Sequence, residues 1–256
     1  MAKLVAINNQ KHRDLFIDTS KAEHYGAELN LIPTVLSEFV SLAVQYPVVF
    51  TKNGDTGEFV CAAMLGFESK ENLFWQDETW QGIYLPLQIQ RQPFFIGEPS
   101  DESSETLEQS KDYVVCIDTE SPMVTQTSSL NTEGKEALYN QNGSESEYLI
   151  QAKNTLAHLL QGEAENEVFI NALKELDLIQ PLSLEIAFIN EHTTRLNGLY
   201  TINQDKFAAL SSDKITSLHQ SSLLQPIYTM IASLGQIYAL IERKNQRIKE
   251  SSSIDV

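Results

Sequence analysis

The sequence predicts an α+β fold, a single domain in which antiparallel β-hairpins pack against helices and a long amphipathic helix ends the chain. Residues 46–66 carry two apolar runs around an Asn-Gly turn, the dipeptide that tight hairpins favour. Strand-like runs dominate the first half, and helical periodicity is more frequent in the second half. No repeat of 20–50 residues is evident, so we expect one domain over residues 1–256.

The first half is expected to contain short strands and one short helix. An N-terminal arm carries a strand at residues 3–7. Residues 34–44 follow as a helix, because Thr34 can cap its start and its apolar residues share one face. After the hairpin we expect an aromatic loop or short strand, one or two helical turns and two strands, at residues 71–80, 83–90, 93–96 and 112–118.

An acidic segment interrupts this half. Residues 98–108 contain five acids, three serines and no base. Such a segment cannot bury enough apolar surface to order itself, so we interpret residues 98–110 as a solvated insertion in the domain. A ligand clamp made of the same acids is the functional alternative.

The second half is expected to be richer in helices, near residues 132–139, 144–160 and 164–176. A strand at 182–189 turns at Asn190–His192 and returns over 196–202. Two short helices follow, at 206–211 with Asp205 as cap and at 214–219 with Ser212 or Asp213 as cap. Residues 250–256 are expected to form a frayed tail.

The last predicted helix, residues 223–241, has no charged residue and precedes a basic cluster, which superficially resembles a membrane span. A polar stripe nevertheless runs along it at helical spacing and consists of Gln225, Thr229, Ser233 and Gln236. We therefore predict a core helix and no membrane span. A membrane contact and a partner-binding helix are the alternatives.

Composition excludes some classes of partner. The chain has 256 residues, 42% hydrophobic, which suits a globular protein with a core. Its formal net charge of -17 argues against nucleic acid as a partner, because phosphate binding depends on Lys and Arg. The acidity can also serve as a docking surface for a basic partner.

The two cysteines and the N-terminus favour the cytoplasm. Cys61 and Cys116 stand in apolar runs without CxxC spacing, as buried free thiols do, although one disulfide between them stays open. The N-terminus has no apolar core of signal-peptide length.

One weak metal pattern is present. His12 and Asp14 form an H-x-D pair, which supplies two ligands of a non-haem iron site, and His24, His158, His192 or His219 is available as a third ligand. Such a pair normally follows a run of strands and does not stand at residue 12. Because the chain has no GxSxG, HExxH or phosphate-binding glycine loop, we predict no cofactor and assign no catalytic residue.

The best binding candidate lies in the aromatic block. Trp80 and Tyr84, with Arg91 nearby, can form a surface on which aromatic faces hold a cation or a proline and Arg fixes a carboxylate. Asn72, in the same block, is included in this candidate site. The competing interpretation is an aromatic core under the sheet.

Short motifs over nearly the whole chain, together with the closing amphipathic helix, carry a family resemblance. The motifs are His12 with Asp14-Leu15, Glu38-Phe39, 46–50 (YPVVF), Leu65-Gly66, Asn72–Phe74, Trp80, Tyr84–Pro86, Pro93-Phe94 and Gly198–Tyr200. Their order and spacing resemble the SapC family, which is named after a bacterial surface-array gene cluster. The resemblance implies a bacterial, single-domain protein linked to surface-layer biology, without agreed catalytic residues. Gln90–Gln92 departs from the family pattern, which tends to be more basic and aromatic there.

We expect a soluble, non-catalytic accessory or binding protein with a protein or peptide partner. Relatives often accompany TonB-dependent receptors, halogenase-like flavoproteins and cupin-like proteins, so the resemblance implies a role in outer-membrane uptake or peptide modification. The alternatives are a 2-oxoglutarate-type iron oxygenase acting on peptides or amino acids, and a structural surface-array component, which the missing export signal disfavours. Ligand identity and homo-oligomer formation stay open.

Overall fold

The computed structural model describes residues 3–97, 113–126 and 134–254. The α+β class is confirmed, with antiparallel sheets, helices and a long C-terminal helix. The chain divides into two compact units, which are Met1–Tyr25 with Leu87–Leu160 and Gly26–Pro86 with Gln161–Val256. The single-domain expectation stays a prediction, and the acidic insertion at 98–110 falls outside the described residues.

The first unit contains two small antiparallel sheets, in the orders β1-β9-β8 and β10-β2-β11. Its elements are β1 (Leu4–Ala6), α1 (Asn9–His12), β2 (Leu15–Ile17), η1 (Thr19–Gly26), α3 (Leu87–Gln90), β8 (Phe94–Gly97), β9 (Val114–Asp118), β10 (Val124–Gln126), β11 (Glu136–Ala137) and the start of α4 (Glu147–Glu175). The core of this unit is formed by Ile17, Phe94, Ile117, Met123, Leu138 and Leu149, all buried.

The prediction of a helix at 132–139 is wrong for residues 134–139, the part of it that the structure describes. Ala137 instead pairs with Phe16 of β2, in strand β11. Gly134, at φ +75°, sets a backbone turn that a helix does not contain. Pairing with β2 places Leu138 in the core with no exposed surface, so tertiary packing overrides the helix propensity of this segment.

The second unit is built on a five-stranded antiparallel sheet in the order β12-β15-β4-β5-β3. These strands are β3 (Leu31–Pro33), β4 (Val48–Lys52), β5 (Phe59–Met64), β12 (Ile179–Pro181) and β15 (Tyr200–Ile202). The predicted hairpin is confirmed as β4–β5, with Phe50 opposite Cys61. Its turn is held by the Asn53 side chain, whose Oδ1 accepts from the N–H groups of Asp55 and Thr56.

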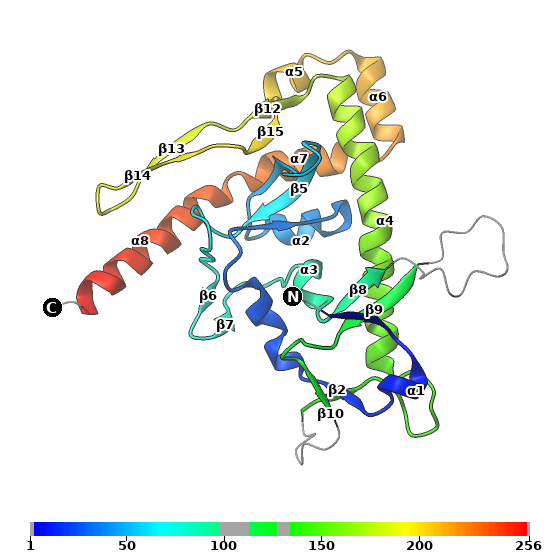
Figure 1. Cartoon of the computed structure of the whole chain (residues 1–256). Helices are drawn as coiled ribbons and strands as arrows, with labels where there is room; N and C mark the ends of the chain where they lie inside the picture. The colour runs from blue at the N-terminus through cyan, green and yellow to red at the C-terminus, as the bar shows by residue number, and fades with distance from the viewer. Residues whose placement is uncertain (1–2, 98–112, 127–133, 255–256) are drawn as a thin grey trace. The chain divides into compact units, whose positions relative to one another are not determined.

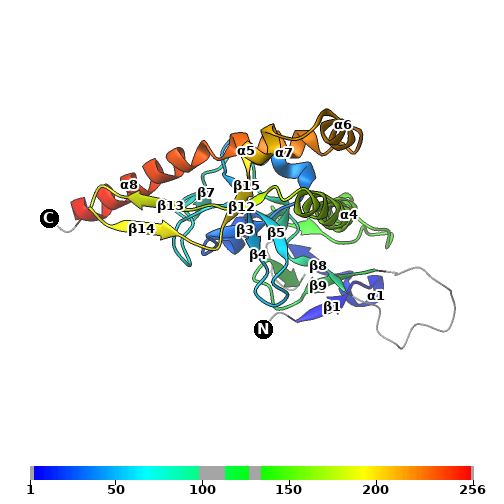
Figure 2. The ribbon, with the colours of Figure 1, turned by 90° about the horizontal axis from the view of Figure 1, so that it is seen from above.

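Helices and two further hairpins complete the second unit (Figure 1). They are η2 (Leu36–Glu38), α2 (Phe39–Ala43), β6 (Trp75–Gln76) with β7 (Thr79–Trp80), the end of α4, β13 (Leu184–Ala187) with β14 (Thr193–Leu196), α5 (Gln204–Ala208), α6 (Ser212–Gln220), α7 (Leu224–Ser233) and α8 (Gln236–Ile254). Hairpin β13–β14 and α8 extend side by side from the sheet in both views (Figure 2). Ile189 N–H donates to Asn245 Oδ1 at 3.0 Å and ties the two together.

Several helix boundaries differ from those predicted. Helix α4 is continuous from Glu147 to Glu175, where two helices were expected. The helix expected at 223–241 is instead two helices, α7 and α8, separated at Leu234 and Gly235. Helix α8 continues to Ile254, beyond the predicted start of the tail. Asn203, rather than Asp205, caps α5 by accepting from Lys206 N–H.

The segment Leu224–Ser252 meets the length and hydropathy of a membrane span, and 33% of its apolar window is buried. Length and apolar composition alone are shared with core helices of soluble proteins. The absence of a membrane span therefore stays a prediction.

Candidate functional site

Asn72 and Trp80, two of the predicted binding residues, are committed to internal hydrogen bonds. Asn72 is 2% exposed, and its side chain donates to Gly26 O at 2.7 Å and accepts from Phe74 N–H at 2.8 Å. The indole Nε1–H of Trp80 donates to Tyr46 Oη at 3.0 Å. These hydrogen bonds therefore hold the aromatic block in place inside the second unit and use the polar groups that a ligand would need.

Tyr84 belongs to the same arrangement, which we call the Tyr46 network and define as Thr34, Glu38, Tyr46, Trp80 and Tyr84. The Tyr46 hydroxyl donates to Tyr84 O at 2.7 Å, and the Tyr84 hydroxyl donates to Glu38 Oε1 at 3.1 Å. Glu38 is 2% exposed, and its Oε2 accepts from the Thr34 hydroxyl at 3.0 Å.

Burial sets the protonation of the two phenols in this network. Burial raises the pKa of Tyr46 to about 12, opposed by the indole N–H of Trp80. Burial, and then the Glu38 carboxylate beside it, raises the pKa of Tyr84 well above its usual range. Both phenols therefore remain neutral donors at physiological pH.

Arg91 lies in the first unit and binds its own segment. Its Nε donates to Gln88 Oε1 at 2.7 Å, and its Nη1 donates to Phe94 O at 2.8 Å. The guanidinium carbon lies 4.4 Å from the centre of the Phe95 ring, a cation–π contact.

His12 and Asp14 also lie in the first unit. His12 Nδ1 accepts from Asn8 N–H at 2.9 Å, and burial lowers the pKa of the imidazole. Across the residues that the structure describes, no group of three or more His, Cys, Asp or Glu side chains is placed to hold a metal ion. The pair therefore acquires no third ligand of these types in the described part of the chain.

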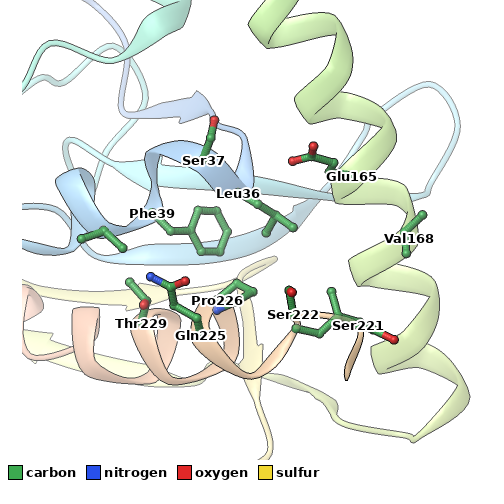
Figure 3. A pocket seen from close by; sticks show the side chains of 12 residues that line it. Leu36, Ser37, Phe39, Glu165, Val168, Ser221, Ser222, Gln225, Pro226 and Thr229 are labelled. Carbon is green, nitrogen blue, oxygen red and sulfur yellow. The ribbon is translucent and has the colours of Figure 1, made fainter. Parts of the chain in front are cut away.

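The second unit carries a groove of about 500 Å³ that motif searching missed (Figure 3). Its lining comes from η2 and α2, from α4, and from the α6–α7 turn with α7. The lining residues are Leu36, Ser37, Phe39, Val40, Glu165, Val168, Ser221, Ser222, Leu223, Gln225, Pro226 and Thr229.

Helix α4 and η2, which line the groove, are joined by the side chain of one asparagine. Asn166 Oδ1 accepts from Leu36 N–H at 3.0 Å, and Asn166 Nδ2 donates to Thr34 O at 2.8 Å. Gly162 permits this close approach, because a Cβ there would lie 2.5 Å from the Cβ of Val35. These contacts therefore fix the distance between α4 and η2.

The α6–α7 turn forms the other wall and has the hydrogen bonds of a Schellman motif. Leu223 N–H donates to Leu218 O at 2.9 Å, and Ser222 N–H donates to His219 O at 3.0 Å. Ser222 takes the left-handed conformation, φ +59°, at the position where glycine is usual. Pro226 follows in the first turn of α7, where a missing N–H costs little.

The groove is apolar with a polar rim. Val40 is 54% exposed and Val168 is 62% exposed, and they line it from α2 and α4. The lining also includes Ser and Thr hydroxyls and the Gln225 amide, and Glu165 is its one charged residue. Glu165 Oε1 accepts from Gln161 Nε2 at 2.8 Å, so its second oxygen remains available for a ligand.

No local motif predicts the groove, because its residues come from segments that lie far apart in the sequence, such as those of Val40 and Val168. One local signal existed, since Val168 follows three glutamates within the largely exposed stretch Glu163–Glu167. A large apolar side chain in such a stretch indicates a helix face that is not simply solvated.

Comparison with known proteins gives one match. No curated protein and no solved structure matches this chain. The SapC family model matches residues 7–240, which is more than half of the chain and includes every residue of the groove and of the Tyr46 network. The chain therefore belongs to the SapC family.

Proposed function

We propose that this protein is a non-catalytic binding protein whose groove takes an amphipathic segment of a protein partner. The observation that carries the proposal is the pair Val40 and Val168, 54% and 62% exposed, lining one groove from two helices. Full burial of an exposed apolar side chain is worth about 1.5–3 kcal/mol, so covering the remaining surface of each half-exposed valine contributes roughly 1 kcal/mol. Contiguous apolar surface rimmed by polar groups is typical of interaction sites.

Charge favours a basic partner segment. Glu165 supplies the one formal charge of the lining, and the whole chain carries a net charge of -17. A field of this sign speeds the approach of a basic segment and repels an acidic one. We therefore assign to the groove an amphipathic helix with apolar side chains on one face and Lys or Arg beside them.

The chemistry of the lining favours binding over catalysis. None of its twelve residues is His, Lys or Cys, and no hydrogen bond joins Glu165, the one carboxylate, to a serine hydroxyl of the lining, as activation of a nucleophile requires. Cytoplasmic location and an accessory role in surface-layer, uptake or peptide-modification systems belong to the same proposal. The accessory role is supported by membership of the SapC family, and the cytoplasmic location by the two free cysteines, Cys61 and Cys116.

The test uses three synthetic helical peptides with the same apolar residues and with Lys, Gln or Glu at the polar positions. Fluorescence anisotropy should show the Lys peptide binding most tightly. Val40→Lys should weaken that binding at least about tenfold, or roughly 1.4 kcal/mol, by adding a like charge to the groove.

Val44→Lys is the matched control. Val44 follows α2 directly, is 60% exposed and does not line the groove. This variant should bind the Lys peptide as the unmodified protein does. Equal losses in the two variants, or equal affinity for all three peptides, would overturn the proposal.

A further inference from the structure

A second cavity, of about 340 Å³, lies between α8 and the tip of hairpin β13–β14. It is lined by Asn190, Lys244, Arg247, Ile248, Ser251 and Ser252. The tip is shaped by Glu191, whose backbone is left-handed at φ +64°, and by the bond from Ile189 N–H to Asn245 Oδ1. The two walls are therefore held together by a contact outside the cavity itself.

The lining is rich in hydrogen-bond donors. It contains an ammonium, a guanidinium and a side-chain amide, and it contains no carboxylate. The hydroxyls of Ser251 and Ser252 donate to the backbone, to Arg247 O and Ile248 O, both at 2.9 Å. Asn190 Oδ1 accepts from His192 N–H at 3.1 Å, which leaves the amide N–H groups for a ligand. This composition is unexpected in a chain with 35 acids and 18 Lys and Arg residues.

The two cations of the cavity differ in how their charge is balanced. Lys244 Nζ is paired with Glu68 at 3.3 Å and with Glu71, so its charge is already compensated. Arg247 donates to two carbonyls, Asn72 O at 3.1 Å and Trp75 O at 2.8 Å. Carbonyls carry no net charge, and no ion pair joins Arg247 to any described carboxylate.

Arg247 is consequently oriented but not neutralised. Two of its five N–H groups are used by the aromatic loop, which leaves three for another acceptor. A planar guanidinium fixed in this way favours the two oxygens of a carboxylate or phosphate group.

We propose that this cavity binds a small oxyanion, held by Arg247 together with the Asn190 side-chain amide. A phosphate group and a carboxylate group share the chemistry that these donors recognise. The site is separate from the groove and does not depend on its function. Five of its six lining residues lie after residue 240, where the SapC match ends.

The test is a titration of the ¹⁵N-labelled full chain with inorganic phosphate and, separately, with acetate at constant ionic strength. Saturable shifts are expected in the Asn190 side-chain amide and in the backbone amides of 247–252. Phosphate saturating at lower concentration than acetate would assign the site to phosphoryl ligands, and the reverse order would assign it to carboxylates. Arg247→Gln should weaken the binding at least about tenfold.

Two variants keep this test decisive. Arg243→Gln removes the same charge one turn earlier on α8, at a residue that does not line the cavity, and should bind as the unmodified protein does. Asn190→Ala, at an exposed position, should weaken binding about threefold even if loss of Arg247 disturbs the aromatic loop. Absence of saturation, or an equal loss in Arg243→Gln, would overturn the proposal.

Discussion

The Tyr46 network and the groove lie in the same unit, but they differ in how far their side chains are exposed to solvent. In the network, Glu38, Tyr46 and Trp80 are buried, and their polar tips bond one another or the backbone. In the groove, Val40 and Val168 keep more than half of their surface exposed. Satisfied buried polar groups specify and rigidify a fold, whereas a contiguous exposed apolar patch is typical of an interaction site. The aromatic block thus supports the fold, and the groove is the site that we propose for a partner.

The largest effect on stability is expected from Glu38→Ala. Removing the carboxylate leaves the Tyr84 hydroxyl, the Thr34 hydroxyl and the Val35 N–H without this acceptor. Loss of about 3 kcal/mol in the free energy of unfolding should follow, measured by urea denaturation. Glu165→Ala, in the groove, should stay within about 0.5 kcal/mol of the unmodified protein. Similar losses in the two variants would erase the distinction between the regions.

A somewhat smaller loss is expected from Gly82→Ala. A Cβ at Gly82 would lie 1.9 Å from Tyr46 Oη and 2.5 Å from Trp80 Nε1, so the network must shift. Overpacking of this kind costs about 1–3 kcal/mol. Gly54→Ala is the control, because a Cβ added at Gly54, in the β4–β5 turn, would meet no atom within 4 Å. Thermal unfolding that is unchanged in Gly82→Ala would show that the network is loose.

Alkaline pH should weaken the network through Tyr46. Its pKa is about 12 in the folded protein, above the ordinary value of 10.0, so between these values the unfolded chain releases a proton that the folded chain keeps. Stability from this group is complete below pH 10 and declines as the pH rises towards 12. Denaturation midpoints across this range should fall less steeply in Tyr46→Phe. An identical pH slope in the variant would contradict the assignment.

The smallest effect is expected at the groove, where Ser222→Gly should stabilise the protein. Ser222 holds φ +59°, a conformation that costs a residue with a Cβ roughly 1 kcal/mol more than glycine. A gain of about that size is expected in urea denaturation, together with weaker binding of the Lys peptide if the hydroxyl contacts it. Destabilisation would show that the serine side chain supports the turn.

The elements predicted best from the sequence are those whose structure depends on neighbouring residues. Asn53-Gly54 between apolar runs predicted the β4–β5 hairpin. Trp80 was predicted as a binding residue, with an aromatic core as the competing interpretation, and it is 9% exposed. The break between α7 and α8 was missed because the polar stripe continues across Gly235. No local pattern predicts the groove, because bringing α4 beside η2 depends on tertiary packing at Gly162 and Asn166.

The central claim is that the groove, and not the aromatic block, receives the partner. A photo-reactive phenylalanine derivative placed at Val168, and separately at Val44, tests this directly with the Lys peptide. Mass spectrometry should find the peptide attached at position 168 and not at position 44. Attachment at both positions alike, or at neither, would contradict the assignment of the groove as the binding site.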